Sequence, residues 1–420
     1  MKSNNSYSDE VNRLRNIAKA FKIDYNFNLI STSDYVNIHK FVKDIRAQIM
    51  QKEFSASIDR MKSPEFKHGK GISQSYFSYE RAYVPYSIET LITKSFKSTK
   101  VSTFITRSGL SSIDLAFQVS IYFLHSVKNK LSSVSFYNYF ETESLIYPKE
   151  HLGLIKNHNS TNFEKFLRLI LKNDPEIIFI ENPLAIPKVG TFNESRFLNT
   201  IEKLNPKKFR IIIFDSTLKG PLNNLEYLLN KLPGSYLIID IVSGIKFYNL
   251  GLELSNLGIT TIWCKDDYIR NQFKARSKVY RAMTGQTIEA VEESYLHPIF
   301  KNLKLVNDHY QAILRNSLVY QKQLYKSGII NKLLLTPIVT INSHWSGEQV
   351  NNTIHSIHDN LENRGLNLST GDSFGFHLTR IQDIHTFDNK HWIRIAPGSF
   401  YSEVDDYIIK YLIKYSKRTY

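Results

Sequence analysis

The sequence predicts an α/β protein built on a mostly parallel β-sheet with helices on both faces. Two observations support this prediction. Short apolar runs alternate along much of the chain with longer segments whose apolar positions lie three and four residues apart, which are the patterns of buried strands and amphipathic helices. Consecutive strands that are separated by whole helices pair in parallel, because each connection has to cross a face of the sheet.

The apolar runs are the predicted strands of this sheet, and helical segments connect them. The strands are expected at 100–106, 132–140, 176–183, 209–217 and 235–243. The helices between them are expected at 111–127, 163–173, 194–204 and 225–232. Ligands of such sheets bind at the carboxyl ends of the strands, so the residues that follow each strand are the candidates for a site.

The chain is predicted to have three parts. Residues 1–70 are expected to form a helical arm, residues 71–290 the large domain that carries the sheet, and residues 291–420 a smaller α/β domain. A long helix, interrupted near Pro298, is expected over 285–327 and would bridge the two domains.

Composition and charge are those of a globular protein. Of the 420 residues, 42% are hydrophobic, which is enough for a large core. The formal charge is +15 (54 − 39), but the basic residues are spread along the chain and form no platform with aromatic residues, so a nucleic-acid partner is disfavoured. The first residues contain no apolar leader, and no stretch is apolar over the roughly 18 to 20 residues that span a bilayer. We therefore expect a cytoplasmic protein with no membrane partner.

Cysteine and histidine usage indicates neither a disulfide nor a metal site. The single cysteine, Cys264, cannot form an internal disulfide and is expected to be a core thiol. His355 and His358 could share a helix face, but no third ligand accompanies them, so no metal is predicted.

Chemically useful residues follow three of the predicted strands. Ser108 and Gly109 open a helix, and small residues there leave backbone N–H groups free to face an anion, although Ser108 would serve equally as an ordinary N-cap. Asp215 ends a second strand, where its carboxylate could hold a protonated ring nitrogen or a metal, or cap a loop. Lys246 lies three residues after Ser243, which ends a third predicted strand. An anion cradle, a carboxylate and an amine at one sheet edge are what an aldehyde cofactor with a phosphate and a basic ring requires.

Eight short motifs in this order resemble the pyridoxal-phosphate enzymes of cysteine and methionine metabolism, namely the cystathionine synthases, cystathionine lyases and methionine lyases. The residues that carry the resemblance are Tyr79, Arg81 and Pro85; Ser108-Gly109-Leu110; Tyr139-Phe140-Glu141-Thr142; Glu181-Asn182-Pro183; Asp215-Ser216-Thr217; Ser243-Gly244-Ile245-Lys246; Ser373-Phe374-Gly375; and Ile393-Arg394-Ile395-Ala396-Pro397-Gly398. The resemblance implies the fold-type I architecture of pyridoxal-phosphate-dependent transferases, like that of aspartate aminotransferase.

The resemblance also implies roles for individual residues. Lys246 would carry the cofactor as a Schiff base and then move the Cα proton, while Asp215 would keep the ring nitrogen protonated. Tyr139 would stack on the ring, and its hydroxyl could assist proton transfer. Arg394 would bind the substrate carboxylate, and Ser373 would lie in the substrate site. The cofactor-binding residues would further include Ser108, Gly109, Leu110, Thr217 and Ser243 of one subunit, and Tyr79 and Arg81 of its neighbour.

The chain departs from the family's pattern at several cofactor contacts. Ala185 stands where the family has an asparagine that contacts the ring oxygen, and Ile245 where it has a threonine that binds the phosphate. Phe140 and Glu141 replace a pair of glycines after the stacking tyrosine. Losing two polar contacts would cost a few kcal/mol of cofactor affinity unless other groups replace them, at about 1 kcal/mol net per hydrogen bond. We therefore expect a divergent member, whose substrate and reaction do not carry over.

The activity predicted from this resemblance is elimination or replacement at Cβ or Cγ of a small amino acid that carries sulfur or an activated oxygen. A homodimer or homotetramer with shared sites is expected. Two alternatives stay open. Asp215 and Lys246 would serve an aminotransferase or another reaction on this fold equally well. A protein that keeps the fold as a binding scaffold but has lost catalysis is disfavoured, because it would have no need for a lysine opposite a carboxylate.

Overall fold

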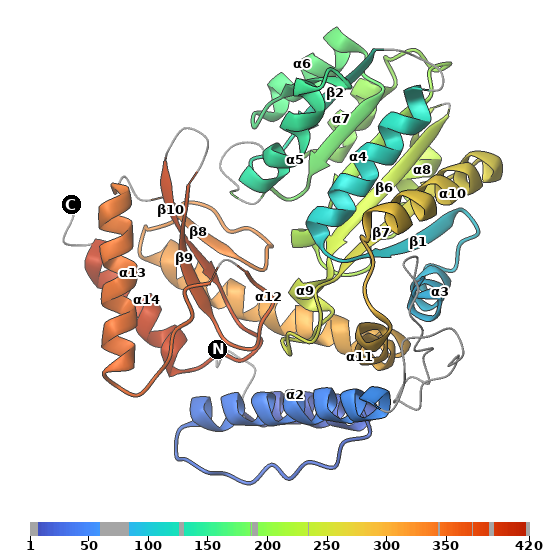
Figure 1. The fold of residues 1–420 in the computed structure, drawn as a ribbon. Helices are drawn as coiled ribbons and strands as arrows, with labels where there is room; N and C mark the ends of the chain where they lie inside the picture. The colour runs from blue at the N-terminus through green and yellow to red at the C-terminus, as the bar shows by residue number, and fades with distance from the viewer. Residues whose placement is uncertain are drawn as a thin grey trace.

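The computed structural model describes residues 7–58, 84–125, 130–184, 186, 192–233, 235–342, 345–371, 373–385 and 390–416. These residues form one large and one small β-sheet, with helices packed around both (Figure 1). The two sheets correspond to separate parts of the chain, because the large one ends before residue 265 and the small one begins after residue 338.

The large sheet is mostly parallel, as predicted. Its described strands follow the order β1-β7-β6-β5-β4-β2-β3, and β2 to β6 run parallel to one another. β7 is antiparallel to both of its neighbours. The bounds are Val101–Thr106 (β1), Leu131–Phe136 (β2), Ile155–Asn159 (β3), Ile177–Glu181 (β4), Arg210–Asp215 (β5), Tyr236–Ser243 (β6) and Gly258–Cys264 (β7).

Two strands of this sheet were not among those predicted. β3 has the sequence Ile-Lys-Asn-His-Asn and lies at the sheet edge, where Ile155 alone among its residues is buried. An edge strand of this kind has no apolar run to reveal it. β7 is buried along its whole length, but Thr260 and Thr261 interrupt its apolar pattern. Cys264 at its end is a buried free thiol, as expected.

Helices cover both faces of the large sheet and bury one apolar core on each. Ile211 and Ile213 of β5 face a core shared with α4 and α10, whereas Ile212 and Phe214 face a core shared with α6, α7 and α8. This alternation explains why the strands are apolar at every position. The covering helices are α3 (Tyr86–Ser95), α4 (Gly109–His125), α5 (Phe140–His151), α6 (Phe163–Asn173), α7 (Glu194–Ile201), α8 (Glu226–Lys231) and α10 (Asp267–Thr284).

The N-terminal helices pack against the helices that lead to the small sheet (Figure 1). These are α1 (Tyr7–Ala20), α2 (Asp34–Ile58), α11 (Ala290–Lys301) and α12 (Leu303–Lys326). The break predicted near Pro298 lies instead at Asn302, whose φ of −130° and ψ of 68° are not helical, while Pro298 lies inside α11. No helix among the described residues is long and apolar enough to cross a bilayer.

The small sheet is antiparallel, with the order β8-β10-β9. Its strands are buried on the face that packs on α13 and α14. The strands are Val339–Asn342 (β8), Arg380–His385 (β9) and His391–Ala396 (β10), and the helices are Gly347–Glu362 (α13) and Glu403–Ser416 (α14). The short helices η1 (Thr217–Lys219) and α9 (Gly244–Phe247) follow β5 and β6 at the edge of the large sheet that faces the small one (Figure 1).

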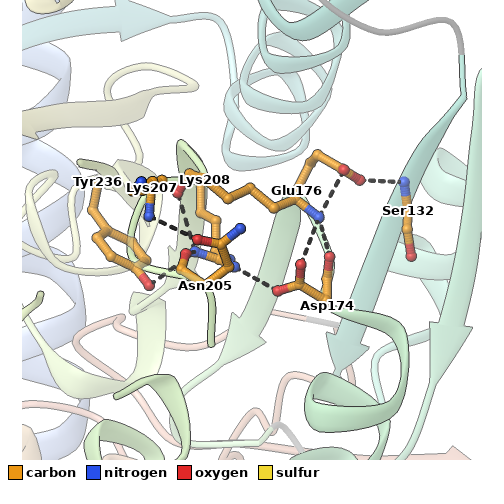
Figure 2. A network of polar contacts seen from close by, with 8 residues as sticks. Ser132, Asp174, Glu176, Asn205, Lys207, Lys208 and Tyr236 are labelled. Carbon is orange, nitrogen blue, oxygen red and sulfur yellow. Dashed lines mark hydrogen bonds and ion pairs between the residues drawn. The ribbon is translucent and has the colours of Figure 1, made fainter. Parts of the chain in front are cut away.

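A polar network ties together the amino ends of the parallel strands (Figure 2). Lys208 Nζ contacts Asp174 Oδ2 at 3.2 Å and Glu176 Oε1 at 2.8 Å. The other oxygen of Glu176 accepts from the backbone N–H of Ser132, at 2.8 Å. The segments before β4 and β5 are thereby joined to β2.

Arg210 is the fully buried member of this network. Its guanidinium donates to Asp174 Oδ1 at 2.5 Å and to the backbone carbonyl oxygens of Asn205 and Lys208 at 2.8 and 3.1 Å. These bonds satisfy carbonyl groups of the turn before β5 and hold that turn against the start of β4.

We expect the substitution Arg210→Met to lower the free energy of unfolding by about 2 to 4 kcal/mol. Breaking a fully buried ion pair costs roughly 3 to 5 kcal/mol, and the expectation is lower here because the Asp174 side chain is 41% exposed and can be solvated. Urea denaturation measures the difference. Lys207→Ala, at an exposed side chain two residues from the turn's start, is the control and should change stability by less than about 0.5 kcal/mol. Equal stability of Arg210→Met and the wild type would contradict the structural role of Arg210.

Candidate active site

A cavity of about 210 Å³ lies at the carboxyl ends of the parallel strands. Its wall combines the start of α4, the ends of β4, β5 and β6, and residues of the small-sheet part of the chain. The lining residues are Ser108, Gly109, Leu110, Ile113, Tyr139, Glu181, Pro183, Asp215, Thr217, Leu218, Ser243, Lys246, Phe374 and Arg394. Nine of these were predicted to be site residues.

Lys246 is the amine of this cavity. Its Nζ donates to Ser373 Oγ at 2.5 Å and lies 4.8 Å from the centre of the Phe374 ring. Burial lowers the pKa of Lys246 to about 8, and the positive charges of Arg394 and Arg380 act in the same direction. A tenth or so of the molecules therefore hold a neutral, nucleophilic amine at pH 7, far more than for an ordinary lysine.

The loop that carries Ser373 and Phe374 packs directly on the backbone of Lys246. A Cβ atom at Gly375 would lie 1.4 Å from the Lys246 carbonyl oxygen, and the φ of Gly375 is +87°. Both facts require glycine at this position. The Gly375 carbonyl oxygen in turn accepts from the buried His309 Nε2, at 2.8 Å. The loop is therefore held between α9 and α12.

Asp215 is the carboxylate of the cavity, at the end of β5. Burial raises its pKa, while hydrogen bonds from Thr217 and the charge of Lys246 act against the rise. The backbone N–H of Thr217 donates to Asp215 Oδ1 at 3.0 Å, and Thr217 Oγ1 accepts from the backbone N–H of Ser243, also at 3.0 Å. A buried carboxylate of this kind gains most from a cationic partner.

Small residues at the start of α4 form a cradle beside these two groups. A Cβ atom at Gly109 would lie 2.8 Å from Ser243 Cβ, so glycine is needed for the two segments to approach. Ser108 Oγ accepts from the backbone N–H of Ser111 at 3.1 Å, which is the N-cap interaction that the sequence also allowed. The helix start faces the cavity, where its dipole and backbone donors favour an anion.

Tyr139 and Arg394 complete the polar wall. Tyr139 precedes α5, and burial together with the Glu141 carboxylate raises the pKa of its phenol, so the hydroxyl is protonated at neutral pH. Arg394 of β10 is 4% exposed and donates from one nitrogen to Gln382 Oε1 at 2.6 Å. Its guanidinium can therefore be held in place by Gln382 while it faces the cavity.

The predicted site residues within the described chain are thus brought to one place. Ser373 contacts Lys246, and the others line the cavity. The remaining predicted residues, Tyr79 and Arg81, lie outside the described residues, as does Ala185. Glu181 and Phe374 also face the cavity, although they were not predicted to be site residues; both belong to motifs that carry the resemblance, which is the signal that pointed to them.

Comparisons with solved structures identify the fold, whereas no family model and no curated protein matches the sequence. Cystathionine gamma-synthase from Xanthomonas oryzae pv. oryzae, in complex with aminoacrylate and cysteine, is 13% identical, with a TM-score of 0.61 over 89% of this chain and 99% of its own. A methionine gamma-lyase from Micromonospora echinospora is 14% identical, with a TM-score of 0.58 over 88% and 97%. Cystathionine gamma-lyase from yeast is 13% identical, with a TM-score of 0.57 over 88% and 98%.

The chain has the fold of these enzymes. The fold-type I architecture expected from the motifs is therefore confirmed. At 13 to 14% identity the likeness concerns the arrangement of the backbone, so the chemistry of the cavity has to be argued from its own residues.

We expect the amine of Lys246 to become reactive with a midpoint near pH 8, rather than near its ordinary value of 10.5, because the neutral form is the nucleophile. Competitive labelling with trace acetic anhydride between pH 6 and 11, followed by mass spectrometry of the peptide, measures the midpoint. Prior dialysis against hydroxylamine releases any aldehyde bound to the amine. Lys246→Arg should lose the labelled site, and a midpoint near 10.5 in the wild type would contradict the burial of the amine.

Proposed function

We propose that this protein is a pyridoxal-phosphate-dependent lyase or transferase that eliminates or replaces a group at Cβ or Cγ of a small amino acid. One observation carries the proposal: the partly buried amine of Lys246, the partly buried carboxylate of Asp215 and the start of α4, whose backbone donors favour an anion, line one cavity. The solved structures of the same fold are named as gamma-synthases and gamma-lyases, which supports this kind of reaction.

The donor set of the cavity fits this cofactor. An aldehyde needs an amine that is neutral near pH 7, a basic ring needs a buried carboxylate, and a phosphate needs backbone donors. Lys246, Asp215 and the segment Ser108–Gly109 supply these groups, with Ser243 beside the cradle. When bound, the cofactor would supply an electron sink for the bonds at the substrate Cα.

The side chains of the chain would then act as follows. Lys246 Nζ would hold the cofactor covalently, give way to the substrate amine, and move the proton at Cα as base and then acid. Asp215 would keep a proton on the ring nitrogen. Arg394 would hold the substrate carboxylate with its planar fork, and Tyr139, protonated at neutral pH, would stack on the ring and donate a proton to the leaving group. Tyr79 and Arg81 of a neighbouring subunit would complete the phosphate site in a homodimer or homotetramer.

We expect the purified protein, with added cofactor, to be yellow, with an absorbance band in the violet to blue region that borohydride at pH 7 removes. Reduction should fix the cofactor to the peptide that contains Lys246, because its amine is the one that lies in the cavity. Lys246→Ala should bind the cofactor without covalent attachment after reduction, and Lys219→Ala, at an exposed lysine near the same sheet edge, is the control that should behave as the wild type. A colourless wild-type protein that stays colourless with cofactor would refute the proposal.

We expect incubation with O-acylated serines and homoserines and with thioether amino acids to release a keto acid and ammonia, or to form a new thioether when a thiol is added. These products define elimination and replacement respectively.

Arg394→Lys should lower kcat/KM by about tenfold or more, because a point charge replaces a bidentate contact. Stoichiometric transfer of the amino group to the cofactor, with no loss of the leaving group, would instead identify an aminotransferase.

A further inference from the structure

Two aromatic side chains of α2, one helical turn apart, dock on the chain that leads into β9 and carries Ser373. Tyr35 donates from its hydroxyl to the backbone carbonyl oxygen of Asn367. His39 Nδ1 lies 3.1 Å from His377 Nε2. The rings of Tyr35, His39 and His377 are stacked in that order, with centroids 6.2 and 5.4 Å apart and interplanar angles of 16° and 18°. α2 is thereby bonded to the chain both before and after Ser373.

The hydrogen bonds around the two imidazoles determine where their hydrogens lie. His377 Nδ1 lies 3.4 Å from the backbone carbonyl oxygen of Gly251, which can only accept, so this nitrogen carries the hydrogen. In a neutral imidazole the other nitrogen then has a lone pair. His377 Nε2 is therefore the acceptor of the contact, and His39 Nδ1 is its donor. The contact needs one hydrogen between the two rings.

The described groups around this pair offer no unengaged carboxylate to a further proton. The charged or titratable groups that face it are Lys43 of α2, Glu10 and Arg13 of α1, His309 of α12, Arg380 of β9, and Glu253. Glu10 binds Arg13 at 2.6 Å, and Glu253 binds Arg380 at 2.7 Å. Both acids are thus neutralised by their own partners, so a charge on either histidine would be poorly compensated.

Both histidines are held in their neutral forms. Burial lowers the pKa of His377 to about 3, and the charges of His39 and Arg13 act in the same direction. Burial and the charge of Lys43 lower the pKa of His39. If both rings were charged, two N–H donors would also face each other across 3.1 Å. The stabilisation that His377 provides is therefore complete above its ordinary pKa of 6.5 and is lost as the pH falls from 6.5 toward 3.

The loop that His39 contacts is the one against which the Lys246 amine rests. This Ser373 loop comprises residues 373–379, directly before β9. Ser373 Oγ accepts from Lys246 Nζ, and Gly375, two residues before His377, lies on the Lys246 backbone. A change in how α2 holds His377 therefore acts on the loop that contacts the amine.

We propose that His39 and His377 form a pH-dependent latch, which holds α2 on the Ser373 loop at neutral pH and weakens that hold in acid. The latch is a regulatory device beyond the proposed function, and it works without a cofactor or a substrate. It connects the N-terminal helices to the loop that contacts the Lys246 amine.

Amide hydrogen exchange of the full chain tests the latch, with mass spectrometry of the peptides from α2 and from the Ser373 loop at pH 7.5 and 5.0. After correction for the intrinsic exchange rate at each pH, the opening equilibrium constant around His39 is expected to be about thirtyfold higher at pH 5.0. The reason is that an undocked His377 takes up a proton with its ordinary pKa of 6.5, whereas the docked ring does not.

A double variant that cannot be protonated isolates the effect. His39→Asn offers an amide N–H in place of Nδ1, and His377→Gln offers an amide oxygen in place of Nε2, so a donor and an acceptor remain. The opening constants of this double variant at the two pH values should differ by less than about threefold. His355→Asn is the matched control, since it removes an exposed histidine of α13 and should keep the thirtyfold ratio.

A double variant with the same ratio as the wild type would overturn the inference, and so would a wild type without pH dependence. If poorer packing makes the double variant open more at both pH values, the ratio between them still decides. Exchange of the imidazole C2 hydrogen in the wild type gives a second measurement, because it follows the protonation of each histidine. A midpoint well below 6.5 is expected for His377, and a midpoint near 6.5 would contradict the latch.

Discussion

The burial of the Lys246 amine against Ser373 and Phe374 is the interaction on which the site depends. Taking an ammonium out of water disfavours its charge, and the hydrogen bond to Ser373 and the face of the Phe374 ring replace only part of the lost solvation. The result is an amine with a pKa of about 8. Because both partners follow α13 in the chain, the amine acquires this property only when the small-sheet part is docked on the large sheet.

Two kinds of contact position the groups of the site, and they lie at opposite ends of the parallel strands. At the carboxyl ends, Gly375 lies on the Lys246 backbone, and its carbonyl oxygen is bound by His309. Burial keeps the pKa of His309 well below its ordinary value, so it acts as a neutral donor. At the amino ends, the network around Arg210 aligns the strands. Strands that start in register end together, which is why Asp215 and Ser243 reach the same cavity.

Much of the fold followed from the sequence, because a strand covered on both faces must be apolar throughout. β1, β2, β4, β5 and β6 were predicted for this reason. The edge strand β3 was missed, since solvent on one side allows it to be polar. The break between α11 and α12 was predicted near Pro298 but lies at Asn302. Pro298 stays inside α11, because a helix can accommodate a proline when the packing of its neighbours outweighs the lost hydrogen bond.

The sequence by itself determined the order of the candidate groups along the chain: an anion cradle, a carboxylate and a lysine, each after a strand. Parallel pairing makes such positions neighbours, so their convergence could be expected from local pattern. Only the tertiary structure decided the electrostatic state of the groups. The lowered pKa of Lys246 and the engagement of Arg380 with Glu253 depend on burial and on distances between segments far apart in the chain. Those quantities have no local sequence pattern, because they arise from how the two sheets pack.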